Sequence, residues 1–131
     1  MNMEERGLAA VEYKHNGCNC CQAVLMSYND CLNLDKDVLM NIGSGFGMGM
    51  GCMEGTCGAL CGAVIASGLI KNGERTTISA KEILKSFKEK SGATICKELK
   101  GIETGKILCS CDDCVKNAST ILSEVLNLET V

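Results

Sequence analysis

Cysteine is the residue type in this sequence best suited to chemistry. The 131-residue chain contains eleven cysteines, and they fall into separate groups along it. The groups are residues 18–21 with Cys31, then Cys52, Cys57 and Cys61, then Cys96 alone, and finally Cys109, Cys111 and Cys114. Thiolates are nucleophiles and soft metal ligands, so this clustering indicates thiol redox chemistry or the binding of zinc or an iron–sulfur cluster.

The rest of the composition bears on where these cysteines work. Residues 1–6 lack the basic start and following apolar run of a signal peptide. The longest apolar stretch, residues 59–70, is interrupted by Gly62 and Gly68 and is too short to span a bilayer. We therefore expect a cytoplasmic protein with no membrane segment, in which reduced cysteines favour metal binding or redox catalysis over structural disulfides. The formal charge of −3 gives no indication of a nucleic-acid partner.

Several cysteines are expected at or near the first turn of a helix. Residues 18–21, Cys57 and Cys111 occupy such positions, where free N–H groups and the helix dipole favour a thiolate. On a helix, Cys57 and Cys61 would share a face, as would Cys111 and Cys114. If the chain works without a metal, Cys57 is our first candidate for the nucleophile.

The elements that position these cysteines are predicted to be helices. Apolar residues recur at helical spacing, whereas the signal for strands is thin. The helical segments are 18–32, 35–42, 57–67, 79–90, 94–100 and a last one that begins near 111. Their predicted caps are Asn16 or Asn19, then Asp35, Thr56, Ser79 with Glu82, and Ser110 with Asp113.

We interpret the whole chain as one all-α domain, a single compact unit of about five helices. Residues 1–131 form the domain, with 1–15 as an N-terminal segment and 16–128 as the cysteine-rich helical core. A glycine-rich loop, residues 43–51, comes before the central helix, which is rich in small residues and can pack closely against a neighbour. Backbone N–H groups of Gly49 and Gly51 can donate to thiolates or to the sulfides of a cluster.

Four segments of the chain carry a resemblance to a known family. Residues 56–63 read Thr-Cys-Gly-Ala-Leu-Cys-Gly-Ala, and they resemble the central motif of the C_GCAxxG_C_C family of redox-active proteins. Residues 19–25 resemble the first helix of that family, with Cys20 in its cysteine position. Residues 96–99 and 111–118 resemble its third and fourth cysteine segments.

The resemblance runs from about residue 17 to residue 126 and carries functional implications. A similar module accompanies the iron–sulfur centre of split-Soret cytochromes. The implied cluster ligands are Cys20, Cys57, Cys96 and Cys111. The implied cofactor contacts are Gly58 and Gly62 of the motif, beside Gly49 and Gly51 of the loop. This chain has further cysteines, and the secondary ligand candidates are Cys21, Cys52, Cys61, Cys109 and Cys114.

Three functional hypotheses remain open at this point. The first is a cysteine-rich redox protein that binds an iron–sulfur cluster of unspecified type for electron transfer or redox sensing. The second is a metal-free thiol–disulfide oxidoreductase that uses Cys57. The third is a binding module for a soft metal, zinc or copper. The expected partner is a redox protein, and the small-residue helix also suits a homodimer; whether the chain is an enzyme stays open.

Overall fold

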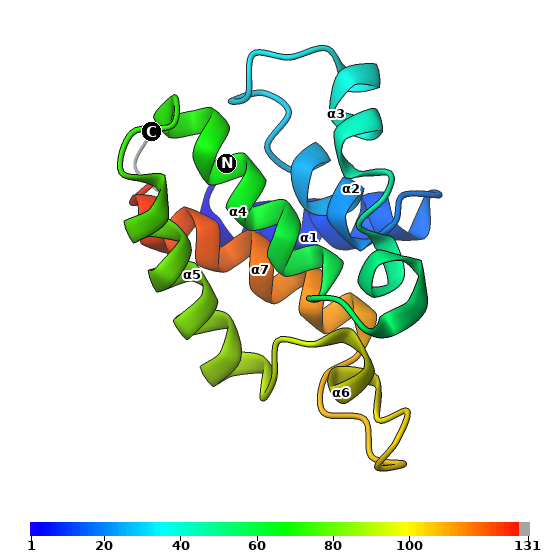
Figure 1. Cartoon of the computed structure of the whole chain (residues 1–131). Helices are drawn as coiled ribbons and strands as arrows, with labels where there is room; N and C mark the ends of the chain where they lie inside the picture. Colours follow the sequence, from blue (N-terminus) through cyan, green and yellow to red (C-terminus); the bar gives the residue numbers. More distant parts are fainter. Residues whose placement is uncertain (129–131) are drawn as a thin grey trace.

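Helices make up most of the chain, and turns and longer loops connect them (Figure 1). The computed structural model describes residues 1–128. Its elements are α1 (Met3–His15), α2 (Cys20–Met26), α3 (Lys36–Gly43), the π-helical turn η1 (Gly49–Met53), α4 (Gly58–Lys71), α5 (Thr76–Ser91), α6 (Cys96–Lys100) and α7 (Cys111–Leu126). In this described part, the only β pairing is a single antiparallel bridge between Thr56 and Ile95. The all-α prediction is therefore confirmed.

The expected count of about five helices is wrong, because residues 1–128 contain seven α-helices and one π-helical turn. Helix α1 was missed because the residues that it buries, Arg6, Gly7 and Ala10, do not form an apolar stripe. A local signal was nevertheless present in a capping box. The Asn2 side chain accepts a hydrogen bond from Glu5 N at 2.8 Å, and the Glu5 side chain accepts one from Asn2 N at 2.9 Å.

Helix boundaries depend on the caps, and three of the predicted residues, Asn19, Asp35 and Ser110, are at the N-cap of a helix. The predicted cap Thr56 is wrong, because Cys57 is the N-cap of α4. Asn19 caps α2 by accepting a hydrogen bond from Gln22 N at 2.8 Å, and Ser110 caps α7 through Asp113 N at 3.1 Å. The predicted capping box at Ser79 is wrong. Helix α5 begins at Thr76, and Ser79 lies buried within it.

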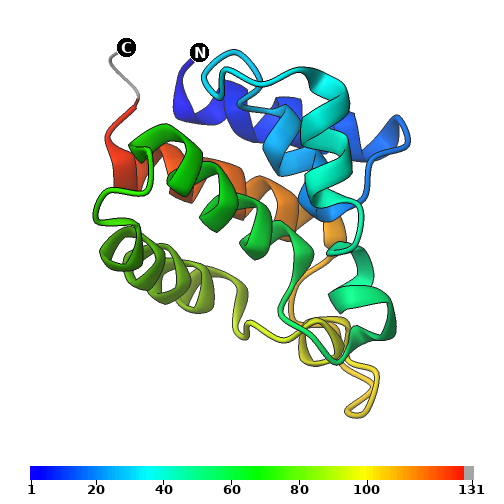
Figure 2. The same cartoon turned by 45° about the horizontal axis from the view of Figure 1, so that its top comes forward.

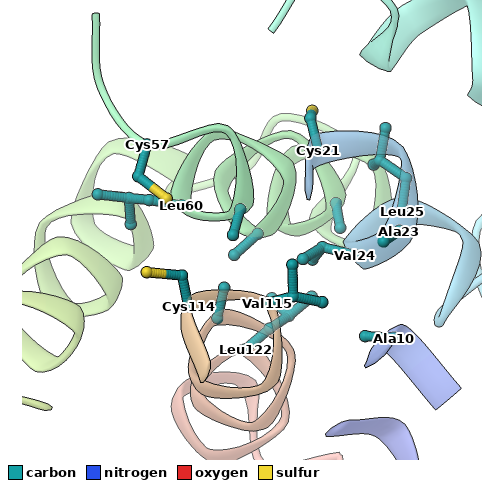
Figure 3. Packing of buried hydrophobic residues seen from close by; sticks show 14 of the residues in the cluster. Ala10, Cys21, Ala23, Val24, Leu25, Cys57, Leu60, Cys114, Val115 and Leu122 are labelled. Atoms are coloured by element: carbon teal, nitrogen blue, oxygen red, sulfur yellow. The ribbon is translucent and has the colours of Figure 1, made fainter. Parts of the chain in front are cut away.

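Helix α7 is the centre of the packing, because α1, α2, α4 and α5 all pack against it (Figures 1 and 2). The core between these helices contains fully buried Leu25, Leu60, Phe87 and Leu122. Figure 3 shows that cysteines take part in this core beside the aliphatic residues. None of the helices in the described part of the chain has the length and apolar character needed to cross a bilayer.

Two glycines of α4 allow neighbouring segments to lie directly against the helix. A Cβ atom built on Gly62 would lie 2.8 Å from the Cys21 carbonyl oxygen and 3.0 Å from Val24 Cβ. A Cβ atom on Gly58 would lie 2.7 Å from the Phe46 carbonyl oxygen. Since neither contact is sterically acceptable, glycine is required at residue 62 for the close approach of α2. Glycine is required at residue 58 for the close approach of the Phe46 backbone, in the loop after α3.

Helix α1 is attached to the end of α2 by a buried arginine. The Arg6 side chain donates a hydrogen bond to the Ser27 carbonyl oxygen at 2.9 Å and pairs with Asp30. Its guanidinium lies over the Tyr28 ring, 4.5 Å from the centroid. This cluster holds α1 in place, although the small residues of α1 bury little apolar surface.

Candidate functional site

The four cysteines implied as ligands all lie where a helix begins. Cys20, Cys96 and Cys111 are the first residues of α2, α6 and α7, and Cys57 is the N-cap of α4. All four side chains line one cavity of about 400 Å³. The first turn of a helix has N–H groups without helical partners and carries partial positive charge, so four such ends around one cavity favour negatively charged sulfur.

The remaining walls of the cavity are sulfur-containing, amide and cationic groups. They are contributed by Lys14, Gly17, Cys18, Asn19, Met48, Met53, Gly58 and Lys100. Cys18, one of the further cysteines of the chain, also lies in the wall, and its thiol is 3.7 Å from the Met40 sulfur. With two lysines among several soft sulfur atoms, the cavity is suited to thiolates and to the soft metal ions that thiolates bind.

Backbone pairing brings Cys57 and Cys96 together. The segments around Thr56 and Ile95 run antiparallel, and Cys57 N donates to the Thr94 carbonyl oxygen at 2.8 Å. Cys96 N in turn donates to the Gly55 carbonyl oxygen at 3.0 Å. These hydrogen bonds hold the two cysteines on adjacent backbone segments, although 38 other residues separate them in the sequence.

The glycine-rich loop closes over Cys96. Gly49 has a φ of +57°, and a Cβ atom there would lie 2.6 Å from Cys96 Cβ. A larger residue would therefore be strained and would also push α6 away from the loop. Of the other glycines proposed as cofactor contacts, Gly58 lines the cavity. Gly62 faces α2 instead, and Gly51 faces open space.

Cys111 is held near α6 by a short backbone link. The Leu99 carbonyl oxygen accepts hydrogen bonds from Leu108 N at 2.9 Å and Cys109 N at 3.3 Å. The Lys100 ammonium donates to the Cys109 carbonyl oxygen at 3.1 Å and to Cys114 Sγ at 3.5 Å. The start of α7 is thereby attached to the end of α6, and the Lys100 charge is directed at the sulfur atoms.

The surroundings of Cys57 lower the pKa of its thiol. Its pKa is lowered to about 6, chiefly because the Cys114 thiol donates a hydrogen bond to its sulfur. Backbone N–H groups of Leu60 and Ala59 and the charge of Lys100 also lower this pKa, while burial opposes them. The hydrogen-bond donors around Cys57 therefore favour its thiolate over its thiol.

The pKa values of three neighbouring thiols, Cys20, Cys96 and Cys114, are raised. The pKa of Cys20 is raised to about 12, chiefly by burial and also by the nearby Cys111 and Cys57 sulfurs, while Lys14 and Lys100 partly oppose the rise. Burial also raises the pKa of Cys96, and the hydrogen bond to Cys57 raises that of Cys114. Deprotonating several of these sulfurs together requires additional positive charge among them.

The secondary ligand candidates lie outside the cavity wall. Cys21 is in the core, where burial raises its pKa to about 12, and Cys61 is half-buried, with a pKa raised by burial to about 11. Cys52 is exposed on η1, whereas Cys109 and Cys114 are buried near the start of α7. The cavity wall thus contains the four main candidates and Cys18. Of the secondary candidates, Cys114 lies behind the wall, where its thiol donates a hydrogen bond to Cys57.

The four cysteines do not form a ready-made site for a single metal ion in the part of the chain that the structure describes. Among the residues that the structure describes, no three cysteine, histidine, aspartate or glutamate side chains lie close enough to share one metal ion. With Zn–S bonds near 2.3 Å, tetrahedral thiolates on one zinc stand only about 3.8 Å apart. The four cysteines line a common cavity without forming such a compact set.

One comparison with known proteins gives a match. The model of the family described as "Putative redox-active protein (C_GCAxxG_C_C)" matches residues 18–125, a segment that contains all four cavity cysteines. No curated protein and no solved structure matches the chain.

Proposed function

This chain belongs to the C_GCAxxG_C_C family of redox-active proteins, and we propose that its redox role depends on an iron–sulfur cluster. The proposed ligands are Cys20, Cys57, Cys96 and Cys111. The observation that carries the proposal is that these four side chains, from the starts of four helices, line one cavity. The function would be electron transfer or redox sensing.

The chemistry of the donors supports a cluster over a single soft ion. Four thiolates suit iron–sulfur clusters or zinc, and hard cations prefer oxygen. In a cluster, thiolates bind different irons and can stand farther apart than ligands of a single ion. A cavity of about 400 Å³ with sulfurs on several walls agrees better with this wider arrangement.

The surrounding residues would adjust the redox properties. When bound, an iron–sulfur cluster supplies one-electron oxidation and reduction. Lys14 and Lys100 in the cavity wall stabilise added negative charge and so favour the reduced state. Gly49 allows the loop to lie against Cys96, and the burial of Cys57 and Cys96 limits access of water to their sulfurs.

Single serine substitutions test the ligand set. Each of Cys20, Cys57, Cys96 and Cys111 is changed to serine, and the full chain is incubated without oxygen with iron, sulfide and a thiol reductant. We expect each variant to lose most of the visible absorption that the wild-type chain acquires. Cys31→Ser is the matched control, because Cys31 is exposed and lies outside the cavity, and it should behave as the wild type does.

Far-UV circular dichroism of every variant shows whether its helices are intact. If the four folded variants acquire the same absorption as Cys31→Ser, the proposed ligand set is wrong. If the visible absorption depends instead on Cys18, the cluster binds elsewhere in the same cavity, and the proposed set of four ligands is also wrong.

A further inference from the structure

Cys57 and Cys114 form a pair whose members differ in access. Figure 3 shows both side chains directed into the space between the start of α4 and the start of α7. Both are buried, with 2% and 0% of their surface exposed. Only Cys57 lines the cavity, so a small molecule inside it reaches Cys57, while Cys114 lies behind.

The Cys114 thiol donates a hydrogen bond to the Cys57 sulfur and has two further polar neighbours. Lys100 donates to Cys114 Sγ at 3.5 Å, and Cys114 Sγ lies 3.8 Å from the Cys109 carbonyl oxygen. Cys109, the nearest other cysteine on the same segment, instead has its sulfur 3.8 Å from the Asn117 amide. Cys57 can be reached from the cavity, and Cys114 is enclosed behind it. This arrangement suits an attacking thiol and a resolving thiol.

We propose that, in the chain without a cluster, Cys57 and Cys114 are a redox-active dithiol that reduces a small hydroperoxide entering the cavity. The Cys57 sulfur attacks the peroxide, a sulfur–oxygen bond forms, the oxygen–oxygen bond breaks, and an alcohol or water leaves. The Cys114 sulfur then attacks the Cys57 sulfenic acid, forming the disulfide and releasing water. The two thiols supply two electrons and two protons, and an external dithiol restores them.

This reaction does not depend on the proposed cluster, and it is tested on full-length chain prepared without iron. The reduced protein is treated with one equivalent of hydrogen peroxide under argon. We expect the loss of two thiols per chain and of two hydrogen masses, both reversed by dithiothreitol.

Peptide mapping identifies the pair that forms. Trypsin releases residues 37–71 and 107–116, which contain three cysteines each, so fragment-ion sequencing must assign the bond. The expected bond joins Cys57 to Cys114. A bond from Cys57 to Cys111, or no bond between the two peptides, would overturn the proposal.

Two variants separate the steps. In Cys114→Ala, the sulfenic acid should persist on Cys57 and be captured by a 1,3-dione reagent. In the matched control, Cys109→Ala, the disulfide should form as in the wild type, because the Cys109 sulfur is not part of the pair. If Cys114→Ala loses two thiols at the wild-type rate, Cys114 is not the resolving thiol. Should Cys114→Ala fail to fold, the mapped bond of the wild type decides alone.

Discussion

Replacing Gly62 by alanine tests how the glycines of α4 position the site. The new Cβ atom would lie 2.8 Å from the Cys21 carbonyl oxygen, which is backbone and cannot rotate away. Helix α2, which begins with Cys20, must therefore shift. Overpacking of this kind costs roughly 1–3 kcal/mol. Alanine is itself a better helix former than glycine by roughly 0.5–1 kcal/mol, which offsets part of the loss.

The same helix provides a control with the same chemical change. A Cβ atom on Gly68 meets only Thr76 Cγ2, at 3.5 Å, which is an ordinary contact. We expect Gly68→Ala to leave stability unchanged or slightly raised, and Gly62→Ala to lower it. Both variants gain the same helix propensity from alanine. The difference between their free energies of unfolding therefore isolates the steric cost at Gly62, about 1–3 kcal/mol.

Urea unfolding followed by circular dichroism measures both free energies on iron-free, reduced protein. The experiment distinguishes close packing from cofactor contact as the role of Gly62, because no cofactor is present. If Gly62→Ala is as stable as Gly68→Ala, the close approach of α2 and α4 does not require glycine and our account of the motif is wrong.

Three further predictions each concern one ion pair or one hydrogen bond, and the same urea unfolding measures the free energy of unfolding of each variant. Asp30→Asn should make the free energy of unfolding less sensitive to acid. Arg6 lowers the pKa of Asp30 in the folded chain. The stability that the Asp30 carboxylate contributes is therefore present above about pH 4 and is lost as the pH falls through the pKa of Asp30 in the folded chain. Equal losses in the wild type and the variant between about pH 6 and pH 3 would contradict this. Tyr28→Phe removes a buried 2.6 Å hydrogen bond to the Ser119 carbonyl oxygen and should cost about 1–2 kcal/mol. Ser110→Ala removes the α7 cap and should cost about 1 kcal/mol, whereas Ser110→Asp should retain stability.

The sequence predicted the local features of this fold well. Asn19 and Ser110 cap helices as expected, because capping depends on residues only three positions apart. The start of α5 was placed too late, since Ser79 matches a capping pattern but is buried by tertiary packing inside a helix that begins at Thr76. Local patterns cannot reveal that burial.

The candidate site could be predicted only in part. The resemblance supplied the set of four cysteines, and the helix-start argument applied to Cys57 and Cys111, which do begin or cap helices. The arrangement around one cavity depends on long-range contacts, such as the bridge between Thr56 and Ile95, that leave no periodic signal. Whether the Cys57 and Cys114 side chains point toward one another depends in the same way on how α4 packs against α7.

The central claim is that the cavity binds an iron–sulfur cluster, and elemental analysis tests it most directly. Full-length protein, purified without oxygen and reconstituted with iron and sulfide, is freed of excess reagents and assayed for both elements. We predict that iron and acid-labile sulfide remain with the chain in roughly equal amounts, as in common clusters. A folded chain that retains neither element would contradict the account.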